Sequence, residues 1–269
     1  MQTLVIYPGR FHPFHRGHRA SYDYLTNKYG ADTVYIATSD VQAPVTSPFS
    51  YADKVKMITS LGIPASHVVQ VKNPYQAREI IDNLPDPENT VLIFAVSQKD
   101  MEGDGARFKF GVKKNGEPSY MQPLPANTKN LQPLTKHAYV EVTPTVNFKV
   151  RGVDASSASQ VRKMYADGND ADRDQIITDL YGEPFPSIRE IFDQRLALTE
   201  KVQDLVYGTP IIDNNSMSSS APMTREHKEK MVRMLESVQR MERRVVESHQ
   251  SINEDLRIDY IDEKKPRKI

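Results

Sequence analysis

The stretch that decides the fold is Gly9-Arg10-Phe11-His12-Pro13-Phe14-His15-Arg16-Gly17-His18. It follows a short apolar run over residues 4–7, which predicts a buried parallel strand, and residues 21–28 behind it carry apolar side chains at helical spacing. We therefore expect these ten residues to form the turn between a first strand and a first helix. A glycine-containing turn that leads into a helix exposes free backbone N–H groups, which is the geometry of a phosphate site.

The residue types in this turn suggest specific uses. Gly9 can adopt backbone angles closed to other residues, and Gly17 would let a ligand approach where the helix begins. His15 and His18 are three positions apart, so both could project over the positive end of the helix and donate to the same phosphate oxygens. Scattered surface histidines are the structural alternative. A zinc site on His12, His15 and His18 is the chemical alternative, although no Cys, Asp or Glu is interleaved.

Two blocks of the sequence carry a family resemblance. Gly-Arg-Phe-x-Pro-x-His-x-Gly-His after an N-terminal strand, here residues 9–18, resembles the signature of the nucleotidyltransferase superfamily, which includes the nicotinamide-mononucleotide and phosphopantetheine adenylyltransferases and the small cytidylyltransferases. Ser157-Ala158-Ser159-Gln160-Val161-Arg162 resembles the family's Ser-Ser-Thr-x-x-Arg helix start. The resemblance covers roughly residues 1–195, and residues 50–54 and 157–159 look most like nucleotidyltransferase-like proteins carried by large tailed phages.

The resemblance implies a transfer in which an acceptor phosphate attacks the α-phosphorus of a nucleoside triphosphate and pyrophosphate leaves. Mg²⁺ would be the cofactor, carried in by ATP or CTP, and no metal site on the protein is expected. His15, His18 and Arg162 would be the catalytic residues, with both histidines at the α-phosphate. Further predicted contacts to the nucleotide and its phosphates are Gly9, Arg10, Phe11, Gly17, Lys54, Ser157 and Ser159, with Ser97 and Lys99 as additional candidates.

Three of these predictions have structural alternatives or departures from the family pattern. Lys54 lies in the first turns of a predicted helix, where a solvated lysine would fit equally well. Ser157 and Ser159 stand where a helix begins, and hydroxyl side chains there commonly act as caps. Before the serine that matches Ser97, many relatives have a glycine, and this chain has Val96.

The remaining sequence alternates strand and helix patterns. Predicted strands cover residues 33–37, 68–71, 91–96 and 138–142, and predicted helices cover residues 50–61, 77–84, 170–181 and 188–207, with another helix from Ser157. This alternation predicts an α/β fold, a Rossmann-like, doubly wound parallel sheet of five strands with a C-terminal helical extension. In such sheets ligands bind beyond the carboxyl ends of the strands where the winding reverses, here between the first and fourth strands by the family's order.

The family resemblance and a change of composition after residue 207 predict the domain organisation. A nucleotidyltransferase domain is predicted over residues 1–207, a flexible linker over 208–223, and a charged helical extension with a basic tail over 224–269. Heptad spacing over residues 224–252 favours a homo-oligomer or a docking partner, and an amphipathic helix folded onto its own domain is the alternative. Residues 103–133 form a long polar segment, which would be either a cover over the acceptor or a surface insertion.

Composition narrows the classes of partner. Lys+Arg and Asp+Glu both number 35, so no overall field favours nucleic acid or an anionic membrane, and attraction for phosphate must be local. The absence of cysteine excludes disulfides and thiolate metal sites. No apolar run approaches the roughly 18 residues of a membrane span, and no signal peptide is apparent. We expect a cytoplasmic protein, in the host cytoplasm or on the virion if it is phage-encoded.

The function predicted from the sequence is transfer of a nucleotidyl group, adenylyl by preference, to a phosphorylated small-molecule acceptor, as in nicotinamide-mononucleotide adenylyltransferases. Residues 48–54 look nearer to the adenylyl enzymes of the family. Two alternatives stay open. One is a cytidylyltransferase acting on a polyol or sugar phosphate, and the other is a catalytically silent nucleotide-binding or structural protein of a phage particle with the same fold.

Overall fold

The computed structural model describes residues 1–43, 46–102, 106–155 and 157–207, without the side chains of 197–207. The chain divides into two compact units, residues 1–202 and 203–269, and the architecture below belongs to the first. The predicted linker over 208–223 and the predicted helical extension over 224–269, including its role in self-association, lie outside the described residues. Within those residues, no helix combines the length and the apolar character needed to cross a bilayer.

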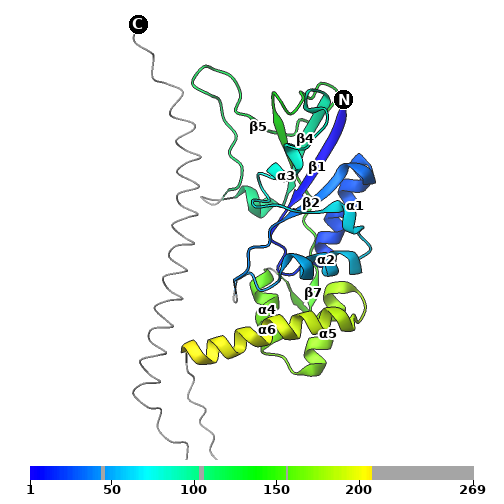
Figure 1. Cartoon of the computed structure of the whole chain (residues 1–269), viewed down its shortest axis with the longest axis vertical. Coiled ribbons are helices and arrows are strands. Elements are labelled where there is room, and N and C mark those ends of the chain that lie inside the picture. The colour runs from blue at the N-terminus through cyan, green and yellow to red at the C-terminus, as the bar shows by residue number, and fades with distance from the viewer. Residues whose placement is uncertain (44–45, 103–105, 156, 208–269) are drawn as a thin grey trace, which may run out of the picture. The chain divides into compact units, whose positions relative to one another are not determined.

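A parallel sheet of six strands forms the centre of this unit (Figure 1). The strand order is β3-β2-β1-β4-β6-β5, and every neighbouring pair is parallel. The strands are β1 (Gln2–Pro8), β2 (Val34–Thr38), β3 (Val68–Gln70), β4 (Thr90–Val96), β5 (Met121–Pro123) and β6 (Ala138–Val142), and β7 (Lys149–Val150) pairs with β8 (Val153–Asp154) in a separate antiparallel hairpin. The predicted doubly wound α/β class is confirmed.

The sheet has one strand more than the five that were predicted. The additional strand, β5, pairs with β6 at the edge of the sheet, with Gln122 opposite Tyr139. It lies inside the polar segment 103–133 and is three residues long, too short to show a period-two pattern. Its pairing depends on β6, a neighbour that only the folded chain supplies.

The described residues form six α-helices: α1 (Arg16–Tyr29), α2 (Tyr51–Ser60), α3 (Arg78–Ile81), α4 (Ala158–Ala166), α5 (Asp170–Tyr181) and α6 (Pro186–Tyr207). Short 3-10 turns η1 (Ala31–Thr33), η2 (Ala65–His67), η3 (Pro87–Asn89) and η4 (Gln98–Met101) complete the described helical segments. Helix α3 is shorter than the predicted 77–84. Ala77 has a left-handed backbone conformation with φ of 46°, and Pro85 disfavours helical geometry at the residue before it.

The two faces of the sheet bury two separate apolar clusters. One face of β1 presents Val5 and Tyr7 to the cluster that includes side chains of α1, α2, α5 and α6. The other face presents Leu4 and Ile6 to a smaller cluster that includes residues around α3. β1 and β4 are therefore apolar on both faces, which explains why they read as continuous apolar runs in the sequence.

The winding of the sheet reverses beside β1. The chain builds β2 and β3 on one side of β1 and then crosses to place β4 on the other side. The turn that follows β1 and the turn that follows β4 consequently leave the sheet next to each other, as predicted. Figure 1 shows α4, α5 and the first part of α6 beyond the carboxyl end of β1, and the Tyr181 hydroxyl of α5 donates to the carbonyl of Phe14 in the turn at 2.8 Å.

A buried carboxylate connects helix α1 to strand β6. Glu141 of β6 is 6% exposed and accepts hydrogen bonds from the hydroxyls of Tyr24 and Tyr29 and from the ammonium of Lys28. A buried carboxylate is stable only when its oxygens are paired in this way. The network therefore holds α1, the helix whose first turn belongs to the candidate site, across β1 and β4.

We expect Glu141→Gln to lower the free energy of unfolding by about 1–3 kcal/mol, because it removes the charge that three donors share. Urea unfolding of the full chain measures this. Glu117→Gln is the matched control, since Glu117 pairs with Lys113 at 3.6 Å on the surface, with its side chain 64% exposed. Equal effects of the two substitutions would contradict the structural role given to Glu141.

Candidate functional site

Two histidines begin helix α1. His15 is the N-cap, and its Nδ1 accepts a hydrogen bond from the backbone N–H of Gly17 at 3.1 Å. The backbone N–H of His15 donates in turn to Nδ1 of His18 at 3.3 Å. The two rings lie 3.9 Å apart between centroids. The helix starts at Arg16, next to Gly17, where it was expected to begin, and side chains satisfy its first free N–H groups.

This capping arrangement sets the chemistry of both imidazoles. A ring nitrogen that accepts a hydrogen bond carries no proton, so the neutral rings of His15 and His18 carry theirs on Nε2. Neither Nε2 atom bonds to a described residue, and among those residues the single buried side-chain N or O atom without a partner is Nδ1 of His137. Both Nε2–H groups therefore reach solvent and can donate to a ligand.

Burial keeps these histidines uncharged near neutral pH. Desolvation lowers the pKa of His18 to about 4, although the negative charge of Asp100 opposes the shift. Desolvation also lowers the pKa of His15 well below its usual value, and the neighbouring His18 and Arg16 add to that effect. As predicted, the pair lies over the N-terminus of α1. The structure adds that both side chains are neutral donors.

The glycines of the turn have uses other than the predicted ones. Gly9 does not adopt a left-handed conformation; instead, a Cβ at Gly9 would lie 2.4 Å from the ring of Phe11. Phe11 itself has a φ of 49° and a buried side chain, so a nucleotide could meet only its backbone. At Gly17, a Cβ would lie 2.9 Å from the His15 ring, so this glycine makes room for the imidazole. The predicted approach of a ligand at Gly17 stays a prediction.

The second motif docks onto the first. Ser157 caps α4, accepting a hydrogen bond from the Gln160 N–H at 3.2 Å, so the structural alternative for this residue is present. Its hydroxyl also lies 3.1 Å from the hydroxyl of Ser159, and both serines are exposed. One turn later, the guanidinium of Arg162 donates to the backbone carbonyl of His12 at 2.6 Å, across a separation of 150 residues. The structure therefore brings the two predicted motifs together.

Lys54 is not the solvated lysine of the structural alternative. Its side chain is completely buried, and Nζ donates to the Ser39 carbonyl at 2.6 Å and lies 3.5 Å from the hydroxyl of Thr38. Desolvation lowers the pKa of this ammonium to about 8, with Arg10 adding to the shift and Asp40 opposing it. Lys54 thus places a buried cation at the carboxyl end of β2, beside the turn that follows β1.

The charges of three cations act on one buried histidine in the turn. Lys54, Arg162 and Arg10 all add to the desolvation that lowers the pKa of His12 to about 3. Burial lowers the pKa of Arg162, and the positive charge of Arg10 adds to that effect. None of the three cations forms a salt bridge with a carboxylate of the described residues. This excess of positive charge indicates a local anion site in a chain that has no net charge.

The turn after β4 faces the histidines through a residue that the sequence analysis missed. Asp100 accepts hydrogen bonds from the hydroxyl of Ser97 at 2.6 Å and from the hydroxyl of Tyr75 at 2.9 Å, and its charge acts on His18. The Ser-x-x-Asp capping spacing could have indicated it. Ser97 is thereby engaged in capping η4, and Lys99 lies on the exposed side of the same turn.

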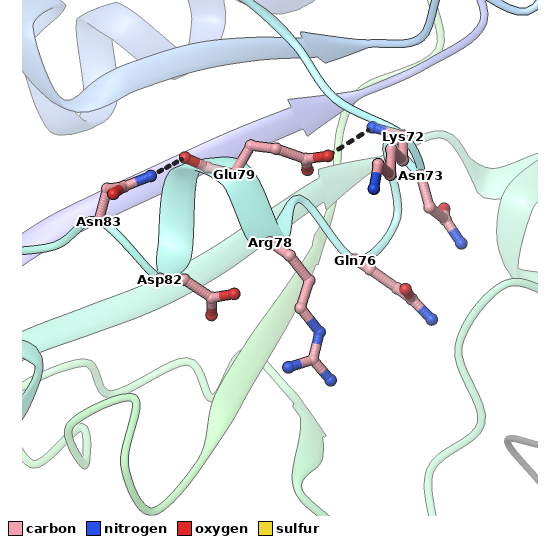
Figure 2. A pocket seen from close by; sticks show the side chains of 7 residues that line it. All are labelled: Lys72, Asn73, Gln76, Arg78, Glu79, Asp82 and Asn83. Atoms are coloured by element: carbon pink, nitrogen blue, oxygen red, sulfur yellow. Dashed lines mark hydrogen bonds between the residues drawn. The ribbon is translucent and has the colours of Figure 1, made fainter.

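A surface pocket of about 410 Å³ lies away from these residues, around α3 (Figure 2). Figure 2 shows Glu79 between the backbone N–H of Lys72, at 2.9 Å, and the side chain of Asn83, which donates to its carbonyl. The pocket shares no residue with the two motifs, so the site argued here rests on the geometry of the motifs. In the described part of the chain, no group of three or more His, Asp or Glu side chains could hold a metal ion, and His12, His15 and His18 do not form the zinc site considered above.

Comparison with known proteins bears on the same segment. Residues 6–113 match the family described as cytidylyltransferase-like. Over 54 residues the chain is 37% identical to the nicotinamide-nucleotide adenylyltransferase of Methanocorpusculum labreanum and 32% identical to that of Sulfurisphaera tokodaii. The shared segment is 20% of this chain and 32% and 31% of the two relatives, so it spans about a third of their length.

Two solved structures also align with this chain. Both are of a bifunctional NMN adenylyltransferase/ADP ribose pyrophosphatase from Francisella tularensis, one of them complexed with AMP and a manganese ion. The complex aligns with a TM-score of 0.43 at 15% identity, over 78% of this chain and 57% of that one. The other aligns with a TM-score of 0.46 at 14% identity, over 77% and 56%.

We expect Gly9→Ala to lower the free energy of unfolding by about 1–3 kcal/mol, because the new methyl group would overlap the buried ring of Phe11. Gly111→Ala is the control, since a Cβ at Gly111 meets nothing within 4 Å. Chemical unfolding of both variants measures the difference. A Gly9→Ala protein as stable as the control would show that the turn does not need this glycine for packing.

We expect the free energy of unfolding to decrease as the pH is lowered, because His18 is neutral in the folded chain. In the unfolded chain His18 takes up a proton near its usual pKa of about 6.5, whereas in the folded chain its pKa is about 4. The stabilisation is therefore complete above pH 6.5 and is lost as the pH falls toward 4, by on the order of 1–3 kcal/mol. Urea unfolding from pH 7.5 to 4.5 should show a smaller loss for His18→Asn than for His137→Asn, a control outside the site. An identical pH dependence in both variants would contradict the assignment.

Proposed function

We propose that this protein transfers an adenylyl group from ATP to a phosphorylated small-molecule acceptor and releases pyrophosphate. The curated relatives that share 54 residues with it carry the name nicotinamide-nucleotide adenylyltransferase, which supports adenylyl transfer and an acceptor of the nicotinamide mononucleotide type. Cytidylyl transfer from CTP to a polyol or sugar phosphate is the second candidate, because residues 6–113 match a family described as cytidylyltransferase-like.

One observation carries the proposal. Arg10, Lys54 and Arg162 form no salt bridge with a carboxylate among the described residues, and they share the carboxyl ends of β1 and β2 with the Nε2–H groups of His15 and His18. Cations without a salt bridge beside neutral donors suit a ligand with several negative charges and a reacting group at which further charge develops. A nucleoside triphosphate has both properties.

The mechanism requires positioning more than acid–base chemistry. A phosphate acceptor is already deprotonated near neutral pH, so it can attack the α-phosphorus in line without a general base on the protein. His15 and His18 would donate through Nε2 to oxygens of the α-phosphate, and their low pKa values leave them as hydrogen-bond donors that carry no charge. Pyrophosphate leaves directly, and no covalent intermediate on the protein is needed.

The cations would hold the rest of the triphosphate. Arg162 presents a fork of N–H groups suited to phosphate oxygens, and Lys54 contributes a point charge from below the turn. Ser157 and Ser159 stand at the N-terminus of α4, where their exposed hydroxyls and the helix N–H groups could reach the same oxygens. Arg10 is exposed and lies within electrostatic reach of both His12 and Lys54.

The described residues do not build a resident metal site, since no group of three or more ligating side chains occurs among them. Mg²⁺ fits this proposal as the counter-ion of the triphosphate, where it would offset charge on the phosphate oxygens. The side-chain contacts to the phosphates that are proposed above do not involve the metal ion.

The test is pyrophosphate release with Mg²⁺ and ATP or CTP against a panel that includes nicotinamide mononucleotide, phosphopantetheine, and sugar and polyol phosphates. We expect release with one pair of substrates, and a loss of on the order of 10²-fold or more in turnover for His18→Ala, because one donor at the α-phosphate is removed. His137→Ala, at a position outside the site, is the matched control.

Full turnover by His18→Ala would contradict the role of His18. Release with CTP alone would select the second candidate. No release with any acceptor, while ATP still raises the melting temperature, would indicate the silent nucleotide-binding or phage structural protein considered above.

A further inference from the structure

His12 has no role in the mechanism above, yet it lies at the centre of the cation cluster. Its side chain is 5% exposed and stacks on Phe49, with ring centroids 6.0 Å apart. Nδ1 of His12 accepts a hydrogen bond from the backbone N–H of Phe49 at 3.4 Å, and the His12 carbonyl accepts from Arg162. The residue is thus anchored on both sides, through its ring and through its backbone.

The remaining ring nitrogen of His12 is available to a ligand. Because Nδ1 accepts a hydrogen bond, the proton of the neutral ring is on Nε2. Nε2 bonds to no described residue, and it is not among the buried atoms that lack a partner, so it reaches solvent. His12 therefore presents an N–H donor through the small part of its side chain that is exposed, in the same tautomer as His15 and His18.

The surroundings of this donor indicate the chemistry of its ligand. Lys54, Arg162 and Arg10 act on the His12 ring, and each lowers its pKa in addition to the effect of burial. Protonation of His12 would add a fourth positive charge to the cluster, so the ring stays neutral near neutral pH. A neutral donor among three cations can bond a phosphate oxygen without adding to the repulsion between the cations.

We propose that His12 is a substrate-binding residue whose Nε2–H donates to the β- and γ-phosphates of the nucleoside triphosphate. This inference rests on the proposed function for the identity of the triphosphate, and it adds a third imidazole donor to the pair at the α-phosphate. The three histidines would then contact different phosphates of the same triphosphate. His15 and His18 serve the reacting phosphorus, and His12 serves the pyrophosphate that leaves.

Two substitutions separate ligand binding from anchoring of the turn. Asn in place of His12 can accept the Phe49 N–H at the position of Nδ1, but it has no group at the position of Nε2. Gln in place of His12 can put an N–H near the position of Nε2, but it has only a methylene at the position of Nδ1. If Nε2 of His12 contacts the ligand, His12→Asn should weaken ligand binding more than His12→Gln does. If His12 only anchors the turn through Nδ1, His12→Gln should be the more damaging substitution.

The readout is calorimetric binding of inorganic tripolyphosphate, ATP and AMP to the full chain at pH 7.5 with Mg²⁺, which requires neither an acceptor nor turnover. We expect His12→Asn to weaken binding of tripolyphosphate and ATP by roughly 10- to 100-fold, the effect of losing one hydrogen bond to a charged group, and to leave AMP binding within about 3-fold. His12→Gln should stay within about 3-fold of the original protein for all three ligands.

A second measurement covers the case in which a variant fails to fold. In the unsubstituted protein, ¹⁵N NMR should show the His12 proton on Nε2 and a shift of that resonance when tripolyphosphate is added. Four results would overturn the proposal: no tripolyphosphate binding by the original protein, equal binding by His12→Asn, equal loss of AMP binding, or an Nε2 resonance that does not respond. Because none of these depends on pyrophosphate release, failure of the proposed function would be recognised separately.

Discussion

The first turn of helix α1 is the constraint on which the site depends. Its free backbone N–H groups need acceptors, and Nδ1 atoms of His15 and His18 supply them. By accepting these bonds the two rings are held in one tautomer, packed within 3.9 Å of each other, and turned so that Nε2 faces solvent. Gly17 belongs to the same arrangement, since any side chain there would displace the His15 ring. One local requirement of a helix thus produces two oriented hydrogen-bond donors.

A second, long-range contact completes the site. Arg162 reaches back from α4 to the carbonyl of His12, and the hydroxyl of Tyr181 in α5 reaches the carbonyl of Phe14 in the same turn. These bonds fix the turn after β1 against helices that are far away in sequence. The charges of Arg162 and of the buried Lys54 both act on His12 in this turn. The positive charge of the site is therefore a product of tertiary packing in a chain with equal numbers of acidic and basic residues.

Local patterns predicted most of the sheet and both motifs because those features depend on near neighbours. Continuous apolar runs identified β1 and β4, which are buried on both faces. β5 escaped prediction because three residues carry no period, and α3 was predicted too long because Ala77 adopts a left-handed conformation that its residue type does not suggest. Asp100 was missed as well. Its capping pattern is visible in the sequence, but its approach to His18 depends on β1 and β4 being adjacent.

The sequence by itself determined which chemical groups are available and roughly where they lie: a strand, a turn with three histidines, and a second motif that ends in Arg162. Only the tertiary structure decided whether these groups are charged and whether they are buried. Desolvation makes His12 and His18 neutral, and neighbouring cations add to that effect at His12. Lys54, which the sequence alone could place on the surface, is completely buried. The pKa of a group depends on every charge and apolar atom around it, including atoms more than a hundred residues away in the chain, so the order of residues cannot specify it in advance.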